Sequence, residues 1–152
     1  MSFAFTSLVV LVIDDQRIAV PVEVVERVVR AVKVVPLPDA PRGVLGVVNV
    51  GGVIVPVFDV RQRLALPPRP LHINDHLVIT RTSRLRMALI VDAVVGVLDG
   101  DDEAMTPAAE IGSGLSSIEG VMKLHGDMVL IENVERFLSG EEHAALDQAL
   151  GL

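Results

Sequence analysis

Residues 44–61 read VLGVVNVGGVIVPVFDVR, and this stretch decides the fold. Two apolar runs, Val44 to Val50 and Val53 to Asp59, flank the pair Gly51-Gly52. Glycine adopts positive φ at little cost, and paired glycines between apolar runs are typical of a tight β-hairpin. Pro56 lacks a backbone N–H, so it predicts an edge strand or a bulge within the second run.

The chain resembles itself on either side of this hairpin. A shift of 69 positions places Arg17-Ile18-Ala19-Val20 on Arg86-Met87-Ala88-Leu89. A shift of 74 positions then places Gly46-Val47 on Gly120-Val121 and Gly52 on Gly126. The second copy therefore carries a longer loop, between about Leu98 and Gly120. A period of this length is too long for a solenoid repeat and predicts two similar lobes, residues 7–68 and 76–138, within one domain spanning 1–152.

The secondary-structure elements expected from the sequence patterns favour an all-β fold with few helices. Each copy opens with two short apolar runs around polar turn residues, which indicates a hairpin. Residues 22–29 suit either a helical turn or a strand, and the pattern does not decide between them. We expect a short helix over 61–66 and a C-terminal helix over 139–152, where Ser139 and Glu142 form a capping box. Numerous short strands rich in valine predict small barrels or a sandwich.

Composition excludes several classes of function. The 152 residues are 51% hydrophobic, with no Trp, Tyr or Cys and a net charge of −7. An acidic chain almost without aromatic side chains is unsuited to nucleic acid, which needs cations for phosphates and rings for bases. The absence of cysteine suits a reducing compartment. No apolar segment is long enough to span a bilayer, and the N-terminus predicts a strand and not a signal peptide.

Three segments contain residue types that can bind a metal ion or a phosphate. His72 and His76 have the spacing of metal ligands on a helix, but prolines precede them and no third ligand is near. Residues 99–103 are acidic but lack the ligand spacing of a calcium loop. Residues 112–117 are rich in glycine and serine but lack the lysine of a phosphate-binding loop. We expect solvated loops at all three, and hence no enzyme activity, cofactor or metal.

Residues 44–61 resemble the signature of CheW-like chemotaxis coupling proteins, which reads roughly G-V-I-N-L-R-G-x-V-x-P-V-x-D-L-R. Residues 19–28, 36–41 and 120–138 also resemble this family, so the likeness covers nearly the whole chain in order. It implies two five-stranded SH3-like β-barrel lobes packed through a shared hydrophobic interior. It also implies a non-catalytic cytoplasmic adaptor, recruited to chemoreceptor arrays, that couples receptor tips to the regulatory domain of a CheA-like histidine kinase. Other CheW-like domains are further candidate partners.

Two positions depart from the family pattern. Gly51 stands where the family has the arginine of N-x-R-G, and ungapped alignment places Arg27 where the family usually has a glutamate. Glu26 lies one place earlier, and a one-residue gap would restore it to the glutamate position. If the acid and the base normally form an ion pair, losing both would destabilise the protein less than losing one, because one loss leaves an uncompensated charge.

The resemblance nominates seven partner-binding residues: Glu26, Arg27, Gly46, Asn49, Gly51, Gly52 and Asp59. Turn residues such as Asn49 and Gly52 also serve the backbone of the hairpin. Met87, Met122 and Met128 suit either the core or a contact surface. Three functions remain open: an adaptor bridging receptor and kinase, a divergent adaptor holding only one of them, and, more remotely, a small-molecule-binding or enzymatic barrel.

Overall fold

The computed structural model describes residues 7–99, 105–107, 118–124 and 126–151. Eleven strands, two α-helices and two single turns of 3-10 helix make up its regular structure in this part of the chain. In chain order these are β1 (Ser7–Ile13), β2 (Gln16–Pro21), η1 (Val22–Val24), β3 (Val25–Arg30), β4 (Val44–Val50), β5 (Val53–Phe58), α1 (Val60–Arg63), β6 (His76–Arg81), β7 (Arg86–Val91), β8 (Ala93–Asp99), β9 (Met105–Pro107), β10 (Ile118–Leu124), β11 (Asp127–Glu132), η4 (Val134–Arg136) and α2 (Gly140–Ala149).

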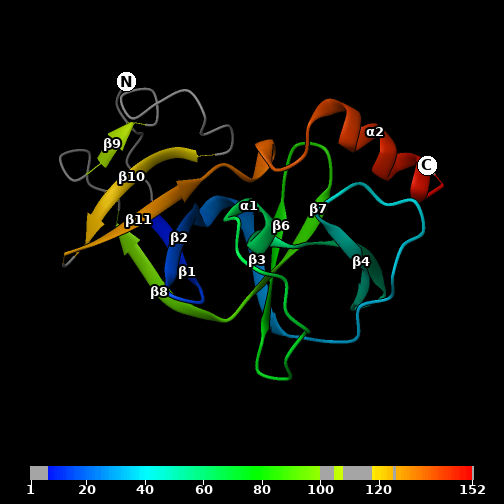
Figure 1. Ribbon diagram of the computed structural model, residues 1–152, viewed down its shortest axis with the longest axis horizontal. Helices are drawn as coiled ribbons and strands as arrows, with labels where there is room; N and C mark the ends of the chain where they lie inside the picture. The colour runs from blue at the N-terminus through cyan, green and yellow to red at the C-terminus, as the bar shows by residue number, and fades with distance from the viewer. Residues whose placement is uncertain (1–6, 100–104, 108–117, 125, 152) are drawn as a thin grey trace.

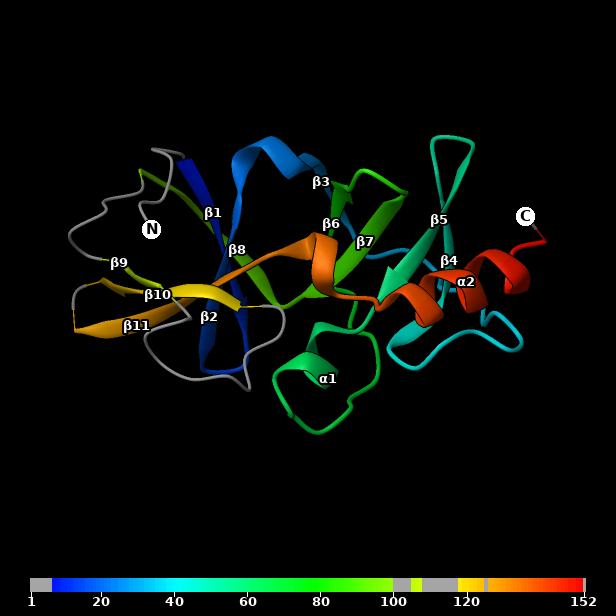
Figure 2. The ribbon, with the colours of Figure 1, turned by 90° about the horizontal axis from the view of Figure 1, so that it is seen from above.

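The strands form two sheets that lie at opposite ends of the molecule (Figures 1 and 2). Sheet A has the order β8-β1-β2-β11-β10-β9, and sheet B has the order β3-β6-β7-β5-β4. Both contain one parallel pair, β2 with β11 and β7 with β5. The two lobes predicted from the resemblance are therefore present, with β9 as a sixth strand in sheet A.

The two sheets exchange strands between the sequence copies. Sheet A takes β1 and β2 from the first copy and β8 to β11 from the second, whereas sheet B takes β3 to β5 from the first copy and β6 and β7 from the second. Neither sheet coincides with residues 7–68 or 76–138. Each copy contributes its first hairpin to one sheet and its remaining strands to the other, so the copies are interlocked.

Strand register reproduces the two shifts of the sequence repeat. The pairing of β3 with β6 skips Glu26, and that of β1 with β8 skips Val95, which lies 69 positions later. In the same way, β4 skips Leu45 against β5, and β10 skips Glu119 against β11, 74 positions later. A bulge bends its strand and redirects a side chain. The duplication therefore extends to the irregularities of the sheets.

Each barrel encloses a core built from equivalent residues. In sheet B the buried set is Val48, Val55, Val57, Leu77, Ile79 and Ala88; in sheet A it is Met122, Val129, Ile131, Leu8, Val10 and Ala19, with Met105 added. A third and larger cluster, including Leu11, Phe58 and Phe137, joins strands of both sheets to α1, η4 and α2. The central strands are apolar on both faces because alternate side chains enter a barrel core and this shared core.

The first hairpin follows its sequence signal. Gly51 and Gly52 form the turn with φ of +57° and +87°. The edge-strand interpretation of Pro56 is wrong for β5 as a whole, which lies between β7 and β4. The proline is accommodated because pairing with β7 begins only at Val57, and the N–H and C=O of the facing Val47 bond to Val35 instead.

The remaining elements resolve the alternatives left by the sequence. Residues 22–29 adopt both structures in turn, since η1 leads directly into β3. The short helix α1 covers residues 60–63, and α2 begins directly after its N-cap Ser139, which forms a capping box with Glu142. The α2 helix packs Leu146 into the shared core. Met87 and Met122 are buried, whereas Met128 is exposed.

Candidate partner-binding site

A groove on sheet B brings together three of the nominated residues. This cavity of about 180 Å³ is lined by Glu26 and Arg27 of β3, Gly51 and Val53 of the hairpin, and Arg86 of β7. Val50, Val55 and Ile79 complete its wall. We call this the β3–β5 groove. Glu26 and Arg86 lie 60 positions apart in sequence and are brought together because β6 pairs with both β3 and β7.

Glu26 is paired within the groove, but not with a residue of the hairpin. Its Oε1 accepts a hydrogen bond from Arg86 Nε at 2.9 Å and lies 3.7 Å from Arg81 Nη1. The Glu26 side chain is 30% exposed and that of Arg86 is 39% exposed. An ion pair this open to solvent contributes about 0–1 kcal/mol to stability. Its charges therefore remain available at the surface.

Asn49, Gly46 and Asp59, which were also nominated, stabilise the local backbone conformation. Asn49 Oδ1 accepts a hydrogen bond from Gly52 N at 2.8 Å and so closes the hairpin turn. A Cβ on Gly46 would lie 2.2 Å from the carbonyl oxygen of Val35, so only glycine allows this approach. Asp59 caps α1, since its Oδ1 accepts from Arg61 N at 3.0 Å.

Gly51 differs from these residues. A Cβ at this position would meet no atom within 4 Å, although its φ of +57° favours glycine. The hairpin therefore leaves open space at the position where the family has an arginine. Glu26, Arg27 and Gly51 remain as the nominated residues that line the groove, and their role in partner binding stays a prediction.

Sequence reasoning missed an arginine–aspartate cluster that ties the two lobes together. Arg61 donates two hydrogen bonds to Asp14, at 3.0 and 2.6 Å, and Asp14 N donates to Asp92 Oδ2 at 2.6 Å. Arg69 holds Asp75 through both carboxylate oxygens and also binds Asp92. These contacts join the β1–β2 turn, α1, the loop before β6 and the β7–β8 junction. Nothing in local spacing signals the cluster, because its members are distant in sequence.

Hydrogen bonds from arginines of this cluster lower the pKa values of two of its carboxyl groups, Asp14 and Asp75. Burial opposes ionisation of Asp75, but the hydrogen bonds from Arg69 and from the His72 N–H outweigh it and hold the pKa of Asp75 below its usual value. The hydrogen bonds from Arg61 likewise lower the pKa of Asp14. Asp75 and Asp14 are therefore ionised at neutral pH, and the cluster is a structural clamp.

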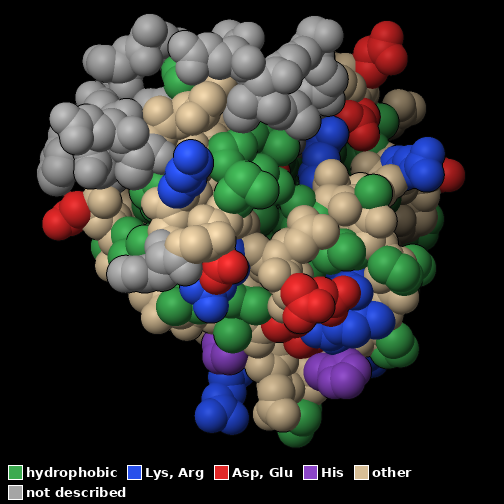
Figure 3. Space-filling view, turned by 60° about the vertical axis from the view of Figure 1, so that its left-hand side comes forward, with side chains coloured by type: hydrophobic (Ala, Val, Ile, Leu, Met, Phe, Trp, Pro, Cys, Tyr) green, Lys and Arg blue, Asp and Glu red, His purple; other side chains and the backbone are tan. Residues whose placement is uncertain are grey.

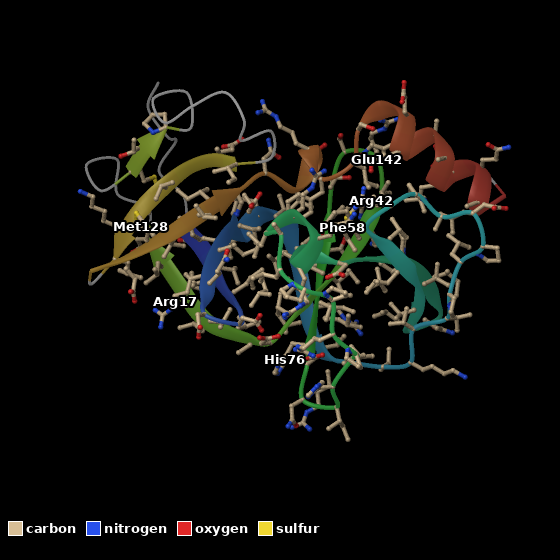
Figure 4. All side chains as sticks on the ribbon, viewed as in Figure 1. Arg17, Arg42, Phe58, His76, Met128 and Glu142 are labelled. Carbon is tan, nitrogen blue, oxygen red and sulfur yellow. The ribbon has the colours of Figure 1, made fainter. Side chains whose placement is uncertain are left out.

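Sheet A carries a second, more acidic concavity. It has a volume of about 550 Å³ and is lined by Asp14, Asp15 and Asp127 together with Arg17 and Met128. Arg17 is the repeat equivalent of Arg86, but Val95 stands at the position equivalent to Glu26. Within the described residues Arg17 has no ion-pair partner. Figure 4 shows Arg17 and Met128 on this lobe, and Figure 3 shows hydrophobic side chains beside acidic and basic ones on this side of the molecule.

The two histidines with metal-ligand spacing lie at the start of β6 and in the loop before it. His72 lies in a turn, and His76 begins β6. Among residues 7–99, 105–107, 118–124 and 126–151, no group of three or more His, Cys, Asp or Glu side chains is arranged to hold a metal ion. Residues 100–103 and 112–117 lie outside the described residues. In the described part of the chain, no helix is long and apolar enough to cross a membrane.

Comparison with known proteins gives this geometry its context. The sequence model of the CheW-like domain matches residues 7–142. The chain belongs to the CheW-like family. The chemotaxis protein CheW of Rhizobium meliloti (strain 1021) is 27% identical over 135 residues, which cover 88% of this chain and 87% of the relative. That of Klebsiella aerogenes is 30% identical over 111 residues, which cover 72% of this chain and 67% of the relative.

The fold of this CheW-like protein is also found among solved structures. The crystal structure of the scaffolding protein TtCheW from Thermoanaerobacter tengcongensis superposes with a TM-score of 0.78 at 24% identity. The match covers 91% of this chain and 97% of that one. The all-β fold with two lobes is thereby confirmed. In this member of the CheW-like family, glycine at position 51 stands where the motif has an arginine.

Proposed function

We propose that this protein is a non-catalytic cytoplasmic adaptor that holds a chemoreceptor's signalling tip and the regulatory domain of a CheA-like histidine kinase at the same time. One observation carries the proposal: exposed apolar side chains recur at equivalent positions of the two lobes. Val28 on β3 corresponds to Val97 on β8, and Ile54 on β5 corresponds to Met128 on β11. Ile54 is 57% exposed and Met128 is 69% exposed.

Such side chains favour protein contacts because burying them against a partner removes apolar surface from water. Two lobes of like shape can each take one partner, and the charges around them differ. Arginines surround Glu26 on sheet B, whereas Asp14, Asp15 and Asp127 dominate the concavity of sheet A. Family membership supports a kinase regulatory domain as one partner, since that domain has the same fold and like lobes would pair. Other CheW-like domains could pair in the same way.

The absence of the motif arginine at Gly51 favours a second candidate function. A divergent adaptor would hold the receptor or the kinase, but not both. A small-molecule-binding or enzymatic barrel has less support, because apolar side chains fill the interiors of both described barrels. We place the adaptor in the cytoplasm, recruited to chemoreceptor arrays, because its proposed partners present cytoplasmic domains there.

Binding measurements with each partner separately test the proposal. The protein is titrated by calorimetry with a recombinant receptor tip fragment and with the recombinant kinase regulatory domain from the same organism. The measurement is repeated with the matched variants Ile54→Lys and Met128→Lys, whose sites are exposed, and with Gly51→Arg. We expect the native chain to bind both partners and each lysine variant to weaken binding of a different one.

The outcomes separate the candidate functions. Binding of one partner only, with the second gained in Gly51→Arg, would establish the single-partner adaptor. Binding of neither partner would refute both adaptor functions. If the two lysine variants weakened the same partner equally, the assignment of one partner to each lobe would be wrong.

A further inference from the structure

The β3–β5 groove contains a basic group that the sequence motif does not reveal. Arg86 reaches the groove from β7, and its Nε donates to Glu26 Oε1 at 2.9 Å. Among the described residues, neither Nη atom of Arg86 has a hydrogen-bond partner. A guanidinium held through Nε presents its two Nη groups as a fork suited to a carboxylate.

The surroundings of Arg86 favour a negatively charged occupant. Arg81 also approaches Glu26, and Arg27 lines the same groove, so three arginines surround one glutamate. This local excess of positive charge lies on a chain whose net charge is −7. Val53, which is 43% exposed, adds an apolar wall to the groove. A segment with an acidic side chain next to apolar ones would match both features.

The other lobe lacks this arrangement although it has the equivalent arginine. Arg17 stands 69 positions before Arg86, but Val95 replaces Glu26 there, and Asp127 replaces Val53 at the hairpin. Without a carboxylate at position 95, Arg17 forms no ion pair with any described residue, although Asp14, Asp15 and Asp127 line the same concavity. The pairing that orients the arginine is therefore specific to sheet B. It makes two lobes of the same fold chemically distinct.

We propose that Arg86, oriented by Glu26, is the specificity-determining residue of the β3–β5 groove and binds a carboxylate on an acidic, apolar segment of one adaptor partner. Gly51 removes the arginine of the motif from the β4–β5 turn. In this chain Arg86, on the neighbouring strand β7, supplies the positive charge of the groove instead. The inference rests on the proposed adaptor function and names the chemistry by which one of its two partners is selected.

A rescue experiment tests the inference. Calorimetric affinities for the receptor tip fragment and for the kinase regulatory domain are measured with Arg86→Gln, and with Arg17→Gln as the matched control in the other lobe. We expect Arg86→Gln to weaken one partner by about tenfold, the cost of losing a hydrogen bond to a charged group, and to make its binding less dependent on salt. The same partner should bind Arg17→Gln with native affinity.

The hairpin provides the second arm of the experiment. Because a side chain at position 51 meets open space, Arg86→Gln/Gly51→Arg should regain most of the lost affinity. Arg86→Gln/Gly51→Asn is the control, since asparagine tolerates positive φ but carries no charge. Urea unfolding of each variant establishes that the fold is retained.

The outcomes distinguish this inference from the adaptor function on which it rests. If the native chain binds its partners and Arg86→Gln changes neither affinity by more than twofold, the role of Arg86 is refuted while the adaptor function stands. Equal recovery with arginine and asparagine at position 51 would also refute it, because charge would then be irrelevant. If the native chain binds neither partner, both proposals fall together.

Discussion

Replacing Gly46 by alanine separates a structural role of the signature motif from a binding role. A Cβ at this position would lie 2.2 Å from the carbonyl oxygen of Val35 and 2.8 Å from its carbonyl carbon. Val35 N donates to Val47 O at 2.9 Å, and Val47 N donates to Val35 O at 2.8 Å. The added methyl group must push the Val35 backbone away and break this pair of hydrogen bonds.

Gly96 provides a matched control for the backbone conformation. Its φ of +153° is close to the +156° of Gly46, yet a Cβ there would meet nothing within 4 Å. Alanine at either position costs about 1–3 kcal/mol in backbone strain. Gly46→Ala loses in addition two backbone hydrogen bonds of about 1 kcal/mol each. We therefore expect Gly46→Ala to be destabilised by about 2 kcal/mol more than Gly96→Ala.

Urea unfolding followed by circular dichroism measures this difference, provided that the slope of the transition is unchanged between variants. The affinity of folded Gly46→Ala for the adaptor's partners should stay near the native value, since Gly46 acts on the backbone. Equal destabilisation of the two variants would refute the argument from the close approach to Val35. Loss of affinity without loss of stability would return Gly46 to the set of contact residues.

Two further predictions follow from the interlocked sheets and from α2. Fragments 7–68 and 76–138, expressed separately, should give the circular dichroism spectra of unfolded chains, because each lacks strands that complete its sheets. A cooperative unfolding transition in either fragment alone would contradict this prediction. Burial, reinforced by the positive charge of Arg84, lowers the pKa of His143 below its usual value. A histidine whose pKa is lower in the folded state stabilises the fold above its unfolded pKa of about 6.5, and this stability is lost as the pH falls below that value. His143→Gln should therefore make the unfolding free energy, measured by urea unfolding, fall less steeply between about pH 7 and 5. If the fall is as steep as in the native chain, other titrating groups cause it.

The two lobes illustrate how a duplicated fold acquires two different surfaces. Their barrel cores use equivalent residues, and even their bulges coincide, so the duplication preserves the framework. The surfaces differ at single positions, such as Glu26 against Val95. A two-partner adaptor needs this difference. Two identical surfaces would bind the same partner, and each partner could then not be assigned to one lobe.

The sequence hypothesis of a related loss of acid and base at Arg27 and Gly51, with Glu26 as the alternative acid position, stays a prediction. All three positions line the same groove, as a lost acid–base pair would require. However, the acid is present at Glu26, and it is paired with Arg86 from another strand. Alignment by sequence could not identify this arginine, because its approach to Glu26 depends on how β3, β6 and β7 pair.

Local signals in the sequence determined the hairpin of residues 44–61, the capping box of Ser139 and Glu142, and the duplication itself. The hairpin and the capping box depend on positive φ at glycine and on side-chain hydrogen bonds three residues apart, which act over short distances, and the duplication can be read by comparing the sequence with itself. Only the tertiary structure decided that the copies exchange strands and that Arg86 faces Glu26. Strand partners distant in sequence are chosen by the burial of whole sheets against a shared core, and no local pattern encodes that choice.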